Sequence, residues 1–227
     1  MADAAEFTDR RAAGKRLARH LMHLRDRNPL VLALPRGGVP VAFEVAVALG
    51  APLDLLFVRK LGAPGYPEYG IGAVVDGADP QLVVNEEIVR ELRVPDSYLR
   101  DELRRQLIEI ERRRHAYVGG REAIPTTGRT VIVVDDGIAT GGTVTAALKG
   151  IRQNHPTHLV LAVPVAPPDV ARSLQAACDE FVCLETPDPF YSVGAHYADF
   201  TQTGDAEVID LLARAAMTRS VAVGPAV

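Results

Sequence analysis

The segment from Val131 to Thr143, VIVVDDGIATGGT, constrains the fold of this chain more than any other stretch. Four apolar residues predict a buried strand, and Asp135 and Asp136 stand where that strand leaves the core. Small and hydroxyl-bearing residues follow, before an expected helix: Gly137, Ala139, Thr140, Gly141, Gly142 and Thr143. Such a loop lets backbone N–H groups converge on a phosphate at a helix N-terminus. Adjacent carboxylates suit two vicinal ribose hydroxyls, so the segment predicts a sugar-phosphate cradle.

The apolar pattern around this segment predicts an α/β fold with a mainly parallel sheet flanked by helices. Strands are expected at residues 30–34, 54–58, 130–134, 159–163 and 181–184. Helices are expected at residues 8–24 with Thr8 as N-cap, 40–49 with Gly50 closing, 86–92, 96–117, 143–153, 169–177 and 205–216. The tail from Met217 is expected to be frayed. Binding sites are expected at the C-terminal ends of the parallel strands.

The remaining stretches are expected to be insertions on one domain that spans residues 1–227. Residues 61–80 are rich in Gly and Pro and predict a flexible loop, with a short hairpin around Ala73 to Val84. A helical insertion is expected at about 76–128, ending in a linker from Gly119 to Gly128. A small C-terminal hood is expected at about 186–203.

The cradle is neither of two common phosphate-binding motifs. It lacks the Gly-Lys-Ser/Thr of a P-loop, and its glycines lack the G-x-G-x-x-G spacing of a dinucleotide fingerprint. It resembles the motif with which type I phosphoribosyltransferases bind 5-phosphoribosyl 1-pyrophosphate (PRPP). The strings LPRGGVP and RKLGAPG resemble those of members whose substrate is unassigned. The 6-oxopurine members carry an acid where this chain has Ala139, which argues against hypoxanthine or guanine as the acceptor.

Two more segments fit this resemblance. Pro35-Arg36-Gly37-Gly38 follows the first expected strand, where the family's pyrophosphate-binding loop lies; taken alone, it is also compatible with a plain turn. Arg59 and Lys60 end the second expected strand and resemble a pair that reaches the pyrophosphate in orotate-type members, although a solvated strand end has the same composition. The resemblance therefore implies catalytic roles for Arg36, Arg59 and Lys60, and PRPP-binding roles for Gly37 and Gly38.

The resemblance also implies a reaction, a cofactor and partners. The enzyme would transfer the 5-phosphoribosyl group to a nitrogenous base and release pyrophosphate, with a loop at 61–72 closing over the site. Asp135 and Asp136 would hold Mg²⁺, partly through water. Its partners would be PRPP and a small-molecule base, and a homodimer is left open. Tyr66 and Glu68 lie in the loop as substrate contacts or as solvated residues.

The acceptor is expected to bind under the hood. Aromatic residues make up only 5% of the chain, yet the hood contains Phe190, Tyr191, Tyr197 and Phe200. The first three are candidates for stacking on a planar base. Packing of the same rings inside their own loop is an equal alternative.

Charge and cysteine content bear on the class of protein. The net charge of −4 provides no general attraction to nucleic acid or anionic membranes. A PRPP-sensing regulator that binds nucleic acid is nevertheless an alternative, because Arg104, Arg105 and Arg112 to Arg114 form a local basic cluster. Acids interleave with these arginines, which favours a helix face laced by i,i+4 charge pairs and makes the regulator the weaker alternative. A bare PRPP-binding or hydrolytic protein is another. The two cysteines, the charged N-terminal stretch and the absence of a long apolar run favour a cytoplasmic protein.

Overall fold

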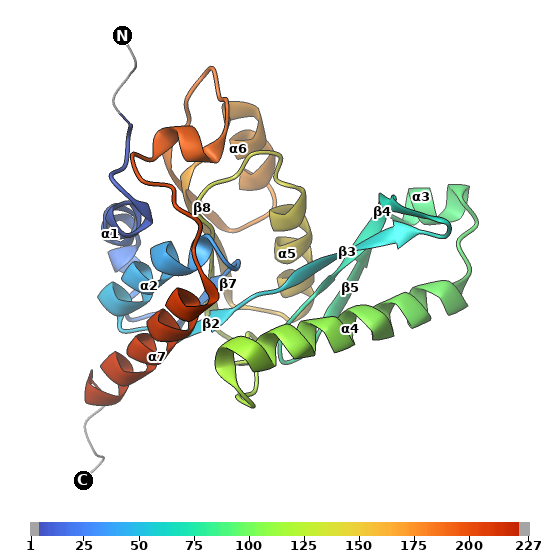
Figure 1. Ribbon diagram of the computed structural model, residues 1–227, viewed down its shortest axis with the longest axis horizontal. Helices are drawn as coiled ribbons and strands as arrows, with labels where there is room; N and C mark the ends of the chain where they lie inside the picture. The colour runs from blue at the N-terminus through green and yellow to red at the C-terminus, as the bar shows by residue number, and fades with distance from the viewer. Residues whose placement is uncertain (1–4, 223–227) are drawn as a thin grey trace.

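The computed structural model describes residues 5–222 as a three-layer α/β body with a projecting arm (Figure 1). The body contains a five-stranded sheet in the order β2-β1-β6-β7-β8, and every neighbouring pair in it is parallel. Its strands are β1 (Pro29–Ala33), β2 (Leu53–Leu55), β6 (Thr130–Val134), β7 (His158–Val165) and β8 (Glu180–Glu185). β1 and β6 are buried along their whole length, as continuous apolar runs in a parallel sheet require.

Helices cover both faces of this sheet. Helices α1 (Arg10–Leu21), α2 (Gly38–Leu49) and α7 (Asp205–Ala222) share one apolar core with the sheet. Helices α5 (Gly142–Gln153) and α6 (Pro168–Gln175) share a second core on the opposite face. The predicted parallel sheet flanked by helices is therefore confirmed.

The ends of the helices follow local capping chemistry. The N-cap of α1 is Asp9, whose carboxylate accepts the N–H of Ala12, so the prediction of Thr8 was wrong by one residue. The last three residues of the helix expected at 8–24 form a separate 3₁₀ helix, η1 (Met22–Leu24). Gly50 closes α2 with a left-handed φ of 63°, as predicted. Helix α7 continues to Ala222, beyond the expected fraying at Met217, and residues 223–227 lie outside the described part of the chain.

The arm corrects the prediction of a loop at residues 61–80. Strands β3 (Val58–Ala63), β4 (Tyr66–Val75) and β5 (Gln81–Val84) form an antiparallel sheet, in which the hairpin expected from Ala73 to Val84 is the β4–β5 pair. Long-range pairing overrides the Gly-rich composition here. Gly72 allows the close strand approach, since a Cβ there would lie 2.4 Å from the carbonyl oxygen of Val83.

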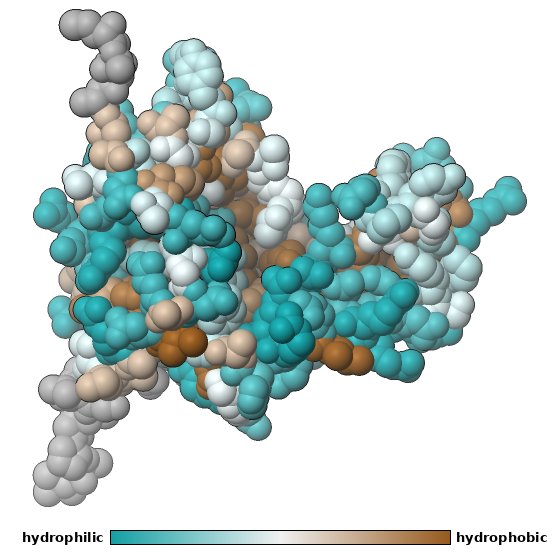
Figure 2. Space-filling view, in the orientation of Figure 1, coloured by the Kyte–Doolittle hydropathy of each residue, from teal (hydrophilic) through white to brown (hydrophobic). Residues whose placement is uncertain are grey.

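Two helices complete the arm, α3 (Glu86–Glu91) and α4 (Asp96–Val118). Helix α4 contacts β3 and β4, whereas α5 of the body contacts all three arm strands. The outward face of the arm around α4 is largely hydrophilic, and a hollow separates the arm from the body (Figure 2). The division into one domain with an insertion at about 76–128 stays a prediction, although the arm begins earlier, at Val58.

No helix among residues 5–222 has the length and apolar character needed to cross a membrane.

Candidate functional site

The loops that follow β1 and β6 are interlocked at the C-terminal edge of the sheet. Gly37 and Gly38 lie so close to the two acids that a side chain at position 37 would displace the Asp136 carboxylate, and one at position 38 would meet the backbone of β6. A Cβ on Gly37 would lie 2.1 Å from Oδ2 of Asp136, and one on Gly38 would lie 2.8 Å from the carbonyl oxygen of Val134. The glycines of the Pro-Arg-Gly-Gly segment therefore bring Arg36 beside the acid pair, which a plain surface turn would not require.

The two acids have different surroundings. Asp136 Oδ2 accepts a hydrogen bond from Arg10 Nε at 2.7 Å, and both side chains are largely buried. Asp135 lines the cleft and accepts the backbone N–H of Asp136 at 2.9 Å. Burial, and secondarily the neighbouring carboxylate of Asp136, raise the pKa of Asp135 well above its usual range. Asp135 is therefore the acid that a cation or a hydrogen-bond donor would stabilise in its charged form.

The small-residue loop has the geometry of an anion site. Gly141 is the N-cap of α5 with a left-handed φ of 75°, and no side chain caps the helix. The first N–H groups of α5 are therefore open to a ligand. Ala139, Thr140, Gly142 and Thr143 are exposed around them. Gly137 packs tightly, because a Cβ there would lie 2.5 Å from Cγ1 of Val193.

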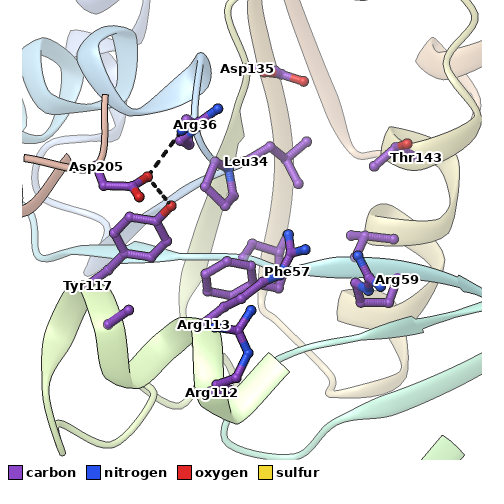
Figure 3. Close-up of a pocket in the computed structure, with 14 residues that line it drawn as sticks. Leu34, Arg36, Phe57, Arg59, Arg112, Arg113, Tyr117, Asp135, Thr143 and Asp205 are labelled. Carbon is purple, nitrogen blue, oxygen red and sulfur yellow. Dashed lines mark hydrogen bonds and ion pairs between the residues drawn. The ribbon is translucent and has the colours of Figure 1, made fainter. Parts of the chain in front are cut away.

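A cleft of about 540 Å³ lies between this edge of the sheet and helix α4. Four arginines line it, together with Asp135, Thr143 and Asp205: Arg36, Arg59, Arg112 and Arg113. Arg36 pairs with Asp205 at 3.2 Å, and Asp205 also accepts the hydroxyl of Tyr117 at 2.7 Å (Figure 3). Four guanidinium groups against two carboxylates give the lining of the cleft an excess of positive charge, which favours an anion.

The structure separates Arg59 from Lys60. Both lie within β3 and not at a strand end, so that part of the prediction was wrong. Because side chains alternate along a strand, Arg59 lines the arginine-rich cleft while Lys60 lines a second cleft of about 600 Å³ beside α5. Thr143 borders both clefts. Arg59 Nε also donates to Gln106 on α4 at 3.0 Å.

The hood candidates differ in exposure. Tyr197 is buried, lies 5.3 Å from the ring of Phe7 and 5.1 Å from that of Phe200, and donates its hydroxyl to the carbonyl oxygen of Asp136. Phe190 stacks on His196 at 5.4 Å. Only Tyr191, which is 83% exposed, has the freedom expected of a stacking residue. The expected stacking role therefore does not fit Tyr197, which instead anchors the hood to the acid pair.

Sequence reasoning missed several residues of the site. Arg10 reaches Asp136 from 126 positions away, and Asp205 reaches Arg36 from 169 positions away, so no local pattern marks either residue. Arg112 and Arg113 were assigned to a charge-laced helix face. They do pair with Glu109 and lower its pKa to about 2, yet they also line the cleft.

The arginine cluster proposed for nucleic acid does not form one surface. Arg114 is buried between Asp54 and Asp76. Arg104 and Arg105 pair with Asp101 and Glu102 on the same helix and do not line the cleft.

Comparisons with known proteins identify the family of this chain. The phosphoribosyl transferase domain family matches residues 4–199. Two curated proteins of Mycobacterium tuberculosis, strains CDC 1551 / Oshkosh and H37Rv, named as provisional phosphoribosyl transferases, are each 48% identical over 209 residues. The match covers 92% of this chain and 47% of theirs, so the chain spans about half the length of these relatives.

A solved structure extends the comparison to the fold. The crystal structure of TT1426 from Thermus thermophilus has 44% sequence identity and a TM-score of 0.79, over 92% of this chain and 98% of that one. With the match over residues 4–199, the chain belongs to the phosphoribosyl transferase domain family.

Proposed function

We propose that this chain is an enzyme that binds PRPP with Mg²⁺, transfers the 5-phosphoribosyl group to a nitrogenous base and releases pyrophosphate. One observation carries the proposal: the interlocked loops after β1 and β6 place Arg36, Asp135 and Thr143 on one cleft. These residues provide, within one cavity, a contact for a diphosphate, an acceptor for ribose hydroxyls and a helix N-terminus for a 5-phosphate. A role in cytoplasmic nucleotide metabolism, with a small-molecule base and no nucleic acid or membrane partner, is part of this proposal.

Different residues contact different parts of PRPP. The loop from Gly137 to Thr143 holds the 5-phosphate, Asp135 and Asp136 accept the ribose hydroxyls, and Arg36 and Arg59 bind the diphosphate. The acceptor nitrogen forms a bond to C1 while the bond from C1 to the diphosphate oxygen breaks, and the electron pair leaves with the diphosphate. A proton from the acceptor nitrogen goes to solvent. Arginines that meet the growing charge on the diphosphate stabilise the transition state.

The acid pair fits Mg²⁺ held mainly by ligand and water oxygens. The described residues contain no group of three or more His, Cys, Asp or Glu side chains that could hold a metal by themselves. Magnesium usually takes one or two carboxylates and completes its shell with water and phosphate oxygens. Asp135 would supply such a carboxylate, whereas one oxygen of Asp136 is already bonded to Arg10. The ion would neutralise charge on the diphosphate.

The first experiment removes the charge of the acid pair. Asp135→Asn with Asp136→Asn should fold and lose PRPP binding, measured by calorimetry and by the rise in melting temperature with PRPP and Mg²⁺. Asp26→Asn with Asp210→Asn is the control, because it removes two charges at exposed positions outside the cleft. Equal binding by the acid-pair variant and the parent would exclude the ribose assignment.

The second experiment identifies the acceptor. Purine, pyrimidine and nicotinate-like bases are supplied with PRPP and Mg²⁺, and pyrophosphate release is measured. A base-dependent release supports the transferase. Release that is independent of every base indicates hydrolysis, and PRPP binding without release indicates a sensor.

A further inference from the structure

We infer that Arg112 and Arg113 of helix α4 form the second wall of the anion site and bind the diphosphate of PRPP directly. The inference rests on the proposed function and assigns ligand contacts to a helix outside the segments that resemble the family's motifs. It follows from the position of α4, from the direction of the two side chains and from their unused hydrogen-bond donors.

Helix α4 is fixed to the body at the level of these arginines. The neighbouring residue, Arg114, is 5% exposed and pairs with Asp54 at 3.2 Å and Asp76 at 2.9 Å. One turn later, the ring of Tyr117 stacks on Phe57 with centroids 6.2 Å apart. The hydroxyl of Tyr117 also donates to Asp205, the partner of Arg36. The helix is therefore held beside the diphosphate loop by contacts that begin one residue after Arg113.

The two arginines lie on the side of the helix that borders the cleft. Figure 3 shows Arg112 and Arg113 extending from α4, with Arg36, Arg59 and Asp135 contributed by the body and β3. The body and β3 contribute two arginines to the lining of the cleft, and α4 adds two more. Arg36 is paired with Asp205, and Arg112 and Arg113 share Glu109, so the four guanidinium groups still outnumber the carboxylates around the cleft. This excess of positive charge attracts an anion into the cavity. A diphosphate is an anion with enough oxygens for several guanidinium groups.

The present partner of the two arginines leaves donors free. Both pair with Glu109 on their own helix: Arg112 uses Nε and Nη2, whereas Arg113 uses only Nε at 2.7 Å. No hydrogen bond from either Nη of Arg113 is found among residues 5–222. Because a guanidinium carries five N–H donors, Arg113 can keep Glu109 and still bind a phosphate oxygen. Glu109 does not line the cleft, so it orients the pair from outside.

The test uses Arg112→Ala with Arg113→Ala against Arg104→Ala with Arg105→Ala. The control removes two arginines from the same helix that are also paired with acids of that helix, but that do not line the cleft. Calorimetry measures affinity for PRPP with Mg²⁺ and for inorganic pyrophosphate with Mg²⁺. We expect the cleft pair to weaken both by at least about tenfold and the control by less than about twofold.

Two further measurements separate the possible outcomes. Arg112→Lys with Arg113→Lys should recover only part of the affinity, because lysine restores charge without the planar donor fork. An unchanged melting temperature without ligand, expected because Arg114 still anchors α4, shows that the fold is intact. The inference would be overturned if the Arg112→Ala, Arg113→Ala variant and the control lost affinity equally, or if neither lost any. In both cases, PRPP binding by the parent protein would still support the proposed function. A parent protein that does not bind PRPP would overturn both.

Discussion

Replacement of Arg114 by methionine should cost this protein a large share of its stability. Arg114 comes from α4 and is the ion-pair partner of two carboxylates that are almost fully buried, Asp54 at 1% and Asp76 at 6% exposed. Methionine keeps most of the side-chain volume, so the variant removes the charge and the hydrogen bonds rather than the packing. Removal of one partner from a buried pair leaves an uncompensated charge and typically costs about 3–5 kcal/mol.

The structure indicates which carboxylate is left unpaired. Asp54 keeps Arg121 at 3.2 Å and the backbone N–H groups of Leu55 and Ile124. Among the described residues, the contact that still favours the charged form of Asp76 is the backbone N–H of Gly77. We therefore expect the free energy of unfolding to fall by about 3 kcal/mol, the lower end of the range typical of a broken buried pair. For a chain of this size, this corresponds to a melting temperature lower by roughly 6–12 °C.

The pH dependence of the variant follows from Asp76. Burial already raises its pKa in the folded protein, and Arg114 opposes that rise. Without Arg114 the folded pKa rises further above the unfolded value of about 3.9. A group of this kind contributes stability below its unfolded pKa and loses it as the pH rises through the folded pKa. The difference in free energy of unfolding between the parent protein and Arg114→Met should therefore become smaller as the pH falls from 7 towards 4.

The assay is urea unfolding followed by circular dichroism at pH 7 and pH 5. Asp76→Asn in the Arg114→Met background should restore part of the stability at pH 7, since it removes the unpaired charge. The reasoning would be refuted if Arg114→Met lowered the free energy of unfolding by less than about 1 kcal/mol at pH 7, or if the double variant were less stable than Arg114→Met.

Three further predictions concern the cleft. Arg36→Ala should lower turnover by about 10²–10³ with a smaller effect on PRPP affinity, measured by steady-state kinetics once an acceptor is known; unchanged turnover with lower thermal stability would make Arg36 structural. Gly37→Ala should push the carboxylate of Asp136 away from Arg10 and weaken PRPP binding in calorimetry, and full affinity would show that this close approach is dispensable. Asp205→Asn should tighten pyrophosphate binding by about two- to fivefold, because it frees Arg36 and removes a negative charge from the cleft; weaker binding would contradict the view of Asp205 as a competitor.

Local patterns were sufficient for the parts of this protein that local physics decides. The apolar run, acid pair and small-residue loop from Val131 to Thr143 predicted strand β6 with its observed bounds and the start of α5 to within one residue. Strand and helix periodicity also predicted the parallel sheet. In each case the information lies within a few neighbouring residues, because the apolar pattern of a strand, the capping of a helix and the turns of a small-residue loop depend on nearby side chains.

The tertiary structure decided which side chains share a cavity. Composition predicted a loop where β3 and β4 pair, because the gain from antiparallel pairing depends on partners outside the window that composition describes. The pairing of β3 then directed Arg59 and Lys60 to different clefts. Docking of α4 through Arg114 placed two arginines of a charge-laced helix along the cleft. Long-range packing made these choices, since residues far apart in the chain become neighbours only when the buried surfaces fit together.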